Sequence, residues 1–201
     1  MTEFAEKPVA LHAELTHRCP LACPYCSNPL ALDPVRGELD TATWRRVLDE
    51  AADAGAMQAH FSGGEPCARR DLEELVAHAD AAGLYANLIT SGVTLDQARL
   101  DRLAQAGLRH IQISFQDVIA EDADRIGNMP DAHARKLKAA RMVVESGLGF
   151  TVNAVIQRHN IERVDAFIDL ALELGAGRIE IAKVQYYVWG LVNRDALMQP
   201  R

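Results

Sequence analysis

One unit recurs along the 201-residue chain: a short apolar strand, a polar loop, an amphipathic helix and a glycine. Strands that alternate with helices form a parallel sheet joined by right-handed crossovers. Six such strands are fewer than the eight that close a barrel. The sequence therefore predicts an α/β fold, a partial (β/α)6 TIM-like barrel with parallel strands. The apolar runs expected to form these strands are residues 11–16, 57–62, 84–90, 110–115, 150–156 and 178–184.

Capping residues and glycines mark the expected helix boundaries between these strands. The expected starts are Asp40 or Thr41, Asp71, Thr94 with Gln97 three residues later, and Asn160. The expected ends are Gly55, Gly83, Gly107, Gly147 and Gly175.

Charge and hydropathy exclude several classes of partner. The net charge of −7 argues against a nucleic-acid partner, which favours a basic stripe. No apolar run approaches the ~20 residues of a membrane helix, and the first residues lack the pattern of a signal peptide. We therefore expect a cytoplasmic protein with one domain over residues 1–201, whose four cysteines stay reduced.

Three of those cysteines, Cys19, Cys23 and Cys26, fall within eight residues after the first expected strand. Structural zinc and a complete iron–sulfur cube usually take four protein ligands. Three thiolates therefore indicate a [4Fe–4S] cube with one iron open to a small molecule. The alternative is a zinc-stabilised, non-catalytic α/β binding module, with His17 or Cys67 as the fourth ligand. Otherwise, Cys67 is expected to be a small buried thiol.

Polar residues follow every expected strand, and the carboxyl ends of parallel strands share one edge of a sheet. Gly63, Gly64 and Glu65 follow the second strand, where the glycines allow a tight turn or the close approach of a ligand. Ser114 and Gln116 end the fourth strand, either as ligand contacts or as caps of the next segment. Asn153 and Glu180 lie inside apolar strands, where an unpaired polar group costs about 1–3 kcal/mol, which favours a role in a site.

The remaining polar residues are expected to have no special role. His12, His60 and His110 lie in or beside strands and are predicted to be core or edge residues. Arg125 and the arginine pairs at 45–46 and 69–70 are predicted to be solvated.

The cysteine spacing Cys-x3-Cys-x2-Cys, followed by Gly-Gly-Glu-Pro after the second strand, resembles the radical S-adenosylmethionine (SAM) superfamily. The resemblance implies a [4Fe–4S] cluster ligated by Cys19, Cys23 and Cys26, with SAM chelating the open iron. It implies no catalytic residue beyond this cluster and the SAM site. The resemblance also implies contacts with SAM. Gly63, Gly64 and Glu65 would meet the methionyl amino group, and Arg125 would meet the methionyl carboxylate. Ser114 and Gln116 (where Asp is usual) would contact the ribose, Tyr25 would lie beside adenine, and Asn153, Glu180 and Ile181 would flank the cofactor and adenine.

Four longer stretches, AELTHRCPLACPYCSNP, SGGEPCARRDL, QISFQD and VQYYVWGLVNRDALM, resemble the PqqA peptide cyclases of pyrroloquinoline quinone (PQQ) biosynthesis within that superfamily. Such an oxidoreductase uses a 5′-deoxyadenosyl radical to join a glutamate and a tyrosine side chain of a precursor peptide. The implied partners are the peptide PqqA, a small peptide-chaperone protein and an electron donor such as flavodoxin. Relatives continue into a domain with auxiliary clusters, so we expect this chain to be the front part of a longer protein. The alternative is a radical SAM enzyme that makes a different peptide crosslink.

Overall fold

A computed structural model of the chain describes residues 7–31 and 37–198. Its centre is a six-stranded parallel sheet in which the strands lie side by side in sequence order. Within the described residues, β1 and β6 pair on one side only, so the sheet is an open, partial barrel, which confirms the predicted fold class. The strands are β1 (Ala10–Glu14), β2 (Gln58–Ser62), β3 (Tyr85–Thr90), β4 (His110–Phe115), β5 (Gly149–Ile156) and β6 (Arg178–Lys183).

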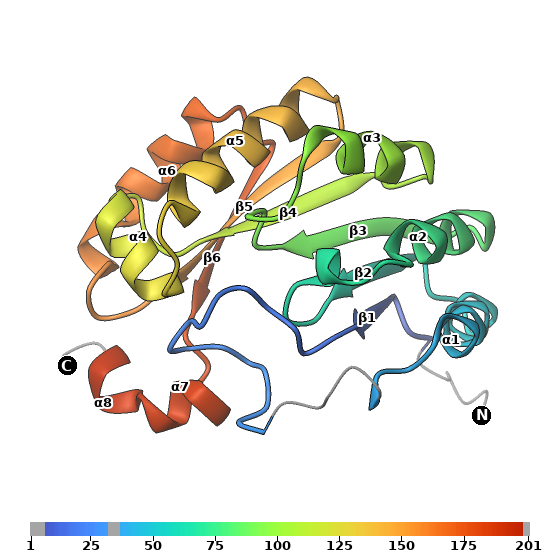
Figure 1. The fold of residues 1–201 in the computed structure, drawn as a ribbon, viewed down its shortest axis with the longest axis horizontal. Helices are drawn as coiled ribbons and strands as arrows, with labels where there is room; N and C mark the ends of the chain where they lie inside the picture. Colours follow the sequence, from blue (N-terminus) through green and yellow to red (C-terminus); the bar gives the residue numbers. More distant parts are fainter. Residues whose placement is uncertain (1–6, 32–36, 199–201) are drawn as a thin grey trace, which may run out of the picture.

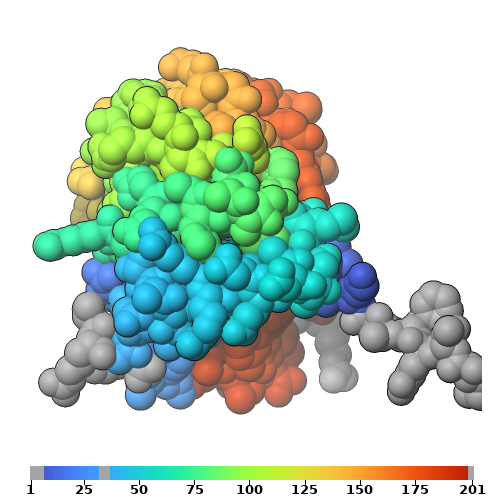
Figure 2. Space-filling view, turned by 90° about the vertical axis from the view of Figure 1, so that its right-hand side faces the viewer, coloured from blue at the N-terminus to red at the C-terminus, as the bar shows by residue number. Residues whose placement is uncertain are grey.

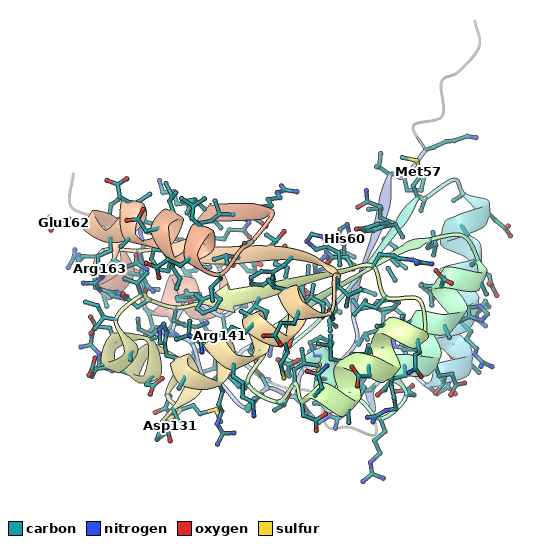
Figure 3. All side chains as sticks on the ribbon, turned by 90° about the horizontal axis from the view of Figure 1, so that it is seen from above. Met57, His60, Asp131, Arg141, Glu162 and Arg163 are labelled. Atoms are coloured by element: carbon teal, nitrogen blue, oxygen red, sulfur yellow. The ribbon has the colours of Figure 1, made fainter. Side chains whose placement is uncertain are left out.

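Helices cover the outer face of this sheet, and the space-filling view shows those of the first half of the chain stacked in sequence order (Figures 1 and 2). Arg141 lies on α5, and Glu162 and Arg163 lie where α6 begins (Figure 3). No helix in the described ranges is both long and apolar enough to cross a membrane. The helices are α1 (Thr41–Asp53), η2 (Pro66–Ala68), α2 (Leu72–Ala81), α3 (Gln97–Gln105), α4 (Ala120–Gly127), α5 (Ala132–Glu145), η3 (Ile161–Arg163), α6 (Val164–Glu173), α7 (Val188–Val192) and α8 (Arg194–Leu197).

The strands have an apolar outer face and a polar inner face. On β4, Ile111, Ile113 and Phe115 are buried, and the Phe115 ring packs edge-on against His133 of α5, with ring centroids 6.1 Å apart. The alternate residues of β4, among them His110 and Ser114, point to the other face because successive side chains of a strand alternate. The hydrophobic core therefore lies between sheet and helices, and the inner face is left for polar groups.

The predicted helix boundaries are mostly confirmed. Asp40 caps α1 by accepting a hydrogen bond from the Thr43 amide at 2.8 Å. The prediction of a start at Thr94 is wrong, because α3 begins at Gln97 and its cap is Asp96, whose carboxylate accepts from the Arg99 amide at 2.8 Å. All five glycines predicted to end helices have a positive φ. The connection from β4 to β5 holds two helices, α4 and α5, separated by Asn128 and Asp131 in the left-handed region.

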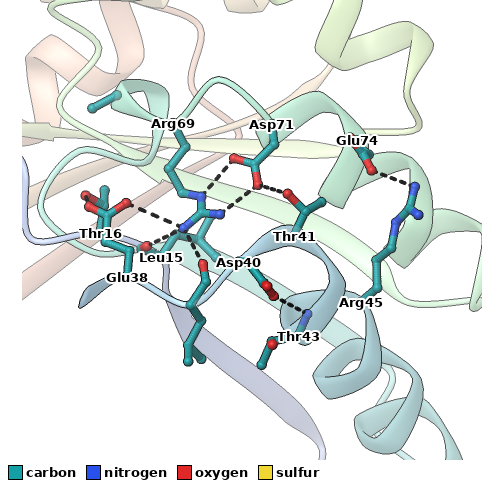
Figure 4. Close-up of polar contacts among 12 residues, drawn as sticks. Leu15, Thr16, Glu38, Asp40, Thr41, Thr43, Arg45, Arg69, Asp71 and Glu74 are labelled. Atoms are coloured by element: carbon teal, nitrogen blue, oxygen red, sulfur yellow. Dashed lines mark hydrogen bonds and ion pairs between the residues drawn. The ribbon is translucent and has the colours of Figure 1, made fainter. Parts of the chain in front are cut away.

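Arg69 is buried, with only 5% of its surface exposed, so its predicted solvation is wrong. Its guanidinium donates to the carbonyl oxygens of Leu15 at 3.1 Å and Leu39 at 3.0 Å, and it pairs with Asp71 at 2.7 Å (Figure 4). Leu15 precedes the three clustered cysteines and Leu39 follows them. One side chain therefore holds together both ends of the segment that carries the cysteines. Arg45, by contrast, pairs with Glu74 at the surface.

Three histidines lie in one row across the inner face of the sheet, near the amino-terminal ends of the strands. His12 and His60 are register partners, and Asn87 is the register partner of both His60 and His110. His60 Nδ1 lies 2.8 Å from Asn87 Nδ2, and His110 Nε2 lies 2.8 Å from Thr151 Oγ1. Burial lowers the pKa of His60 and of His110, and a neighbouring positive group adds to this at each ring.

This row predicts that acid destabilises the fold. A depressed histidine pKa means that the unfolded chain binds its proton first, near its unperturbed value of about 6.5. The stabilisation is therefore complete above that pH and is lost as the pH falls toward the lower, folded pKa. We expect the free energy of unfolding, measured by urea titration, to fall less steeply between about pH 7 and pH 5 in His110→Gln. His12→Gln, an exposed position in the same row, should have a smaller effect, because it removes only the contribution of His12 to the lowered pKa of His60. Equal slopes in His110→Gln and wild type would contradict the prediction.

Candidate cluster and cofactor site

A cavity of about 320 Å³ opens at the carboxyl ends of the strands. The loop after β1 forms one wall, and the carboxyl ends of β2 to β6 form the others. The structure therefore brings together most of the residues predicted from sequence to form a site. Those that line the cavity are Cys19, Cys23, Tyr25, Cys26, Gly63, Gly64, Ser114 and Gln116.

The other predicted site residues lie elsewhere. Asn153 and Glu180 share a register row with Ser114, on the inner face of the sheet but outside the cavity lining. Ile181 follows Glu180 on β6 and is 42% exposed. Arg125, on α4, has a side chain 69% exposed and pairs with Asp122. Cofactor contacts by these four residues remain predictions.

The cysteine loop lies between two hollows. On its other side is a cavity of about 290 Å³, lined by the same three cysteines with His17 and the α7 residue Trp189 among others. The Asn193 side chain, between α7 and α8, donates to the Pro24 carbonyl at 2.9 Å. The Ala22 amide donates to the Gly127 carbonyl of α4 at 2.9 Å. The loop that carries the cysteines is thus held from both flanks, by α4 and by the α7–α8 segment, which lies next to it in Figure 1.

The donor set fits a cluster better than a single ion. In a cube each thiolate binds its own iron, so the sulfurs surround a volume instead of meeting at one point. Within residues 7–31 and 37–198, no group of three or more His, Cys, Asp or Glu side chains is arranged to hold one metal ion. Burial raises the pKa of Cys19 to about 11 and that of Cys23 to about 12, so a bound metal must supply the positive charge that keeps them as thiolates.

Cys67 is the buried thiol that the sequence predicted. It is 5% exposed, lines neither cavity and has its sulfur 4.0 Å from Thr90 Oγ1. Burial raises the pKa of this thiol above its usual range. The structure therefore does not support Cys67 as a fourth zinc ligand.

The two glycines after β2 allow the cysteine loop to lie directly on the GGEP turn. The Gly64 amide donates to the Thr16 carbonyl at 2.6 Å, and the Glu65 amide donates to the Arg18 carbonyl at 2.7 Å. A Cβ atom on Gly64 would lie 2.5 Å from the Arg18 oxygen, and Gly63 adopts a φ of +131°. Close approach of the chain to itself is thus one reason for glycine at both positions.

Gly64→Ala is therefore expected to displace the cysteine loop. The atoms that meet the new Cβ are backbone, so the loop itself must move. We expect the purified chain to retain less than about half of the iron that the unaltered chain holds after reconstitution, because misplaced ligands weaken a metal site. Gly177→Ala is the control, since a Cβ there has ordinary contacts only. Iron content equal to wild type in Gly64→Ala would contradict the prediction.

Glu65 lies behind the cavity wall and is fully buried. One carboxylate oxygen accepts from the Cys67 amide at 3.0 Å and from Thr90 Oγ1 at 2.6 Å. The other accepts from the Ser91 amide at 2.9 Å and from the Ser91 hydroxyl. The side chain therefore ties the GGEP turn to the end of β3. Its predicted contact with a methionyl amino group remains a prediction.

Two adjacent residues that follow β4, Gln116 and Asp117, have different roles. The Asp117 carboxylate accepts from the Val118 and Ile119 amides at 2.7 and 3.1 Å and so fixes the turn before α4, whose N-cap, Ile119, makes no side-chain bond. The Gln116 side chain does not cap; its Oε1 accepts from Lys136 of α5. Sequence reasoning missed Lys136. A signal was present, because Lys136 occupies a core position of α5, in step with Ala132, Ala139 and Val143.

Comparison with known proteins gives the family of this fold. Residues 13–171 match the Radical SAM superfamily. A PqqA peptide cyclase of Gluconobacter oxydans is 58% identical over 96% of this chain and 54% of its own length. This chain spans about half the length of the curated relatives that it matches.

Solved structures agree on the fold. Streptococcus suis SuiB bound to S-adenosylmethionine superposes with a TM-score of 0.82 at 19% identity, over 97% of this chain and 44% of SuiB. SuiB bound to its precursor peptide SuiA gives 0.79 at 22% identity, over 90% and 40%. The open, partial barrel is thus a fold shared with SuiB. Because the family model matches residues 13–171, the chain belongs to the radical SAM superfamily.

Proposed function

We propose that residues 1–201 are the radical SAM core of a PqqA peptide cyclase, which joins a glutamate and a tyrosine side chain of the peptide PqqA by a carbon–carbon bond. The observation that carries the proposal is the position of Cys19, Cys23 and Cys26 on one cavity with the GGEP turn and the end of β4. The identity of 58% to a PqqA peptide cyclase supports the choice of substrate.

Radical SAM enzymes use a [4Fe–4S] cluster and SAM, and the cavity residues fit that pair. When bound, these cofactors supply a 5′-deoxyadenosyl radical that takes a hydrogen atom from the substrate. Cys19, Cys23 and Cys26 would hold the cluster. Gly63 and Gly64 would place backbone beside the methionyl amino group, and Tyr25 would lie against adenine. The work of the chain is to orient these groups and to exclude water from the cavity.

The partners follow from the same proposal. SuiB, which shares the fold, has been crystallised with its precursor peptide. For this chain we propose the precursor peptide PqqA, a small peptide-chaperone protein and an electron donor such as flavodoxin, all in the cytoplasm. Lys183, Gln185 and Tyr187 line the cavity from the β6 side, where the barrel is open. The peptide would enter there.

Anaerobic reconstitution tests the reaction class. The chain should bind about four iron and four sulfide and, once reduced, convert SAM into methionine and 5′-deoxyadenosine. One zinc per chain, with no iron retained, would instead favour the non-catalytic binding module.

Isotope transfer tests the substrate. PqqA deuterated on its crosslinking glutamate side chain is incubated with SAM, reductant and the reconstituted chain. Deuterium in the 5′-deoxyadenosine supports the proposal, because it reports the hydrogen atom taken. Deuterium that arrives only from other positions of a peptide would favour an enzyme that makes a different crosslink.

A further inference from the structure

Lys136 is a fully buried lysine next to the site, with no exposed surface. Its ammonium donates to the Ser114 carbonyl at 2.6 Å and to Gln116 Oε1. Both acceptors are neutral. Among residues 7–31 and 37–198, no carboxylate lies within the 4.0 Å of an ion pair from Lys136 Nζ.

A buried charge without a partner is costly, so native proteins pair it or bind something that does. Burial lowers the pKa of Lys136 to about 8, and the anionic forms of Cys23, Glu65 and Cys19 act against that shift. Glu65 already accepts four hydrogen bonds from other groups. Asp124 also favours the charged lysine, but its carboxylate accepts from the Asp131 and His133 amides. Ser114 and Gln116, the acceptors of Lys136, line one cavity with Cys19 and Cys23, so the thiolates of the cysteine loop are the anions that remain.

We propose that Lys136 is the buried counter-charge of the cluster site, a positioning residue whose ammonium offsets the negative charge of the thiolate-bound cluster. The inference rests on the proposed cluster and SAM site. A fixed positive charge favours the reduced, more negative state of a cluster, and so raises its reduction potential. Lys136 thereby makes it easier for an electron donor to reduce the cluster, while the reduced cluster becomes a weaker reductant toward SAM.

The same lysine also sets the direction of Gln116. Because Gln116 Oε1 accepts from Lys136, its amide nitrogen is left to face the other way. Gln116 lines the cavity and its side chain hydrogen-bonds Tyr25, another lining residue, so its N–H donors face the cavity on the Tyr25 side. An aspartate at this position would present acceptors. A ligand hydroxyl that approaches the Gln116 amide nitrogen would therefore accept a hydrogen bond from it instead of donating one.

Lys136→Met in the reconstituted chain tests the charge. Its side chain has a similar length and no charge. We expect the equilibrium constant for one-electron reduction of the cluster to fall on the order of tenfold, which corresponds to a midpoint potential about 59 mV more negative. A redox titration monitored by electron paramagnetic resonance measures this potential. Lys138→Met is the matched control, because Lys138 lies on the same helix and is exposed. Lys136→Arg should restore the potential.

Gln116→Met separates the effect of Lys136 on the reduction potential from the effect of Gln116 on SAM binding. It keeps the charge of Lys136, so the potential should match wild type, while the affinity for SAM, measured by calorimetry, should fall several-fold.

The outcomes are distinguishable. An unchanged potential in Lys136→Met, with iron and SAM cleavage intact, overturns the role of Lys136 and leaves the proposed function standing. Failure of Lys136→Met to fold before reconstitution also overturns it, because the lysine would then serve the framework. A wild-type chain that takes up no iron defeats both proposals.

Discussion

Cys26→Ala is expected to remove the iron–sulfur cluster from the chain and to abolish SAM cleavage. Only three thiols line the cavity, and the fourth cysteine, Cys67, is buried elsewhere. No spare thiol can therefore replace the lost ligand, and a cube left with two protein ligands is not retained. Iron and sulfide assays and the visible absorbance of the cluster report the first effect, and 5′-deoxyadenosine formation reports the second.

Cys67→Ser is the matched control for that variant. It alters a thiol that lines neither cavity, so iron content and SAM cleavage should stay close to wild type. A Cys26→Ala chain that still holds a full cluster and cleaves SAM would place the third ligand elsewhere.

Glu65→Gln is expected to lower both the stability of the chain and its affinity for SAM. The Gln amide has only one acceptor oxygen, so its nitrogen would face two hydrogen-bond donors. Depending on its orientation, these are the Ser91 amide and hydroxyl, or the Cys67 amide and the Thr90 hydroxyl. We expect the free energy of unfolding to fall by roughly 2–4 kcal/mol, because hydrogen bonds to a buried charge are lost and donors are left unpaired. SAM affinity should fall about tenfold or more, because the displaced turn carries Gly63 and Gly64.

Glu74→Gln is the control, because it removes a carboxylate charge at the surface instead of in the interior. Glu74 makes a surface pair with Arg45, so its loss should change stability by less than about 0.5 kcal/mol. Urea unfolding measures both variants, and calorimetry on the reconstituted chain measures SAM affinity. If Glu65→Gln keeps wild-type stability and loses only SAM affinity, its carboxylate contacts the cofactor directly and does not hold the turn.

Periodicity was sufficient to predict the sheet, because a strand or helix with one buried face repeats its apolar residues at a fixed spacing. The cysteine loop and GGEP turn were also predictable, since parallel strands bring their carboxyl ends to one edge. Arg69 and Lys136 were not, because hydropathy assigns a charged residue to solvent. Their burial depends on acceptors far away in the sequence, such as Leu39 for Arg69 and Ser114 for Lys136.

The cofactor contacts assigned by motif position remain predictions, and the directions of those side chains were the least predictable part of the site. Arg125 and Glu65 both follow the family pattern, yet one is exposed on α4 and the other is fully bonded within the chain. A motif fixes a position along the backbone, whereas the direction of a side chain depends on the donors and charges that surround it.

The bonds from Arg69 to Leu15 and Leu39 tie together the two ends of the cysteine-bearing segment, and none of these three residues is a cluster ligand, so we expect the bonds to form whether or not the cluster is bound. The conformational entropy of loop closure is then lost during folding and not during assembly of the cluster. We therefore expect iron and sulfide to meet ligands whose flanks are already fixed, and cluster assembly to require little reorganisation of the chain. A chain that loses its cluster to oxygen should therefore accept a new one without unfolding, and the same molecule can be repaired.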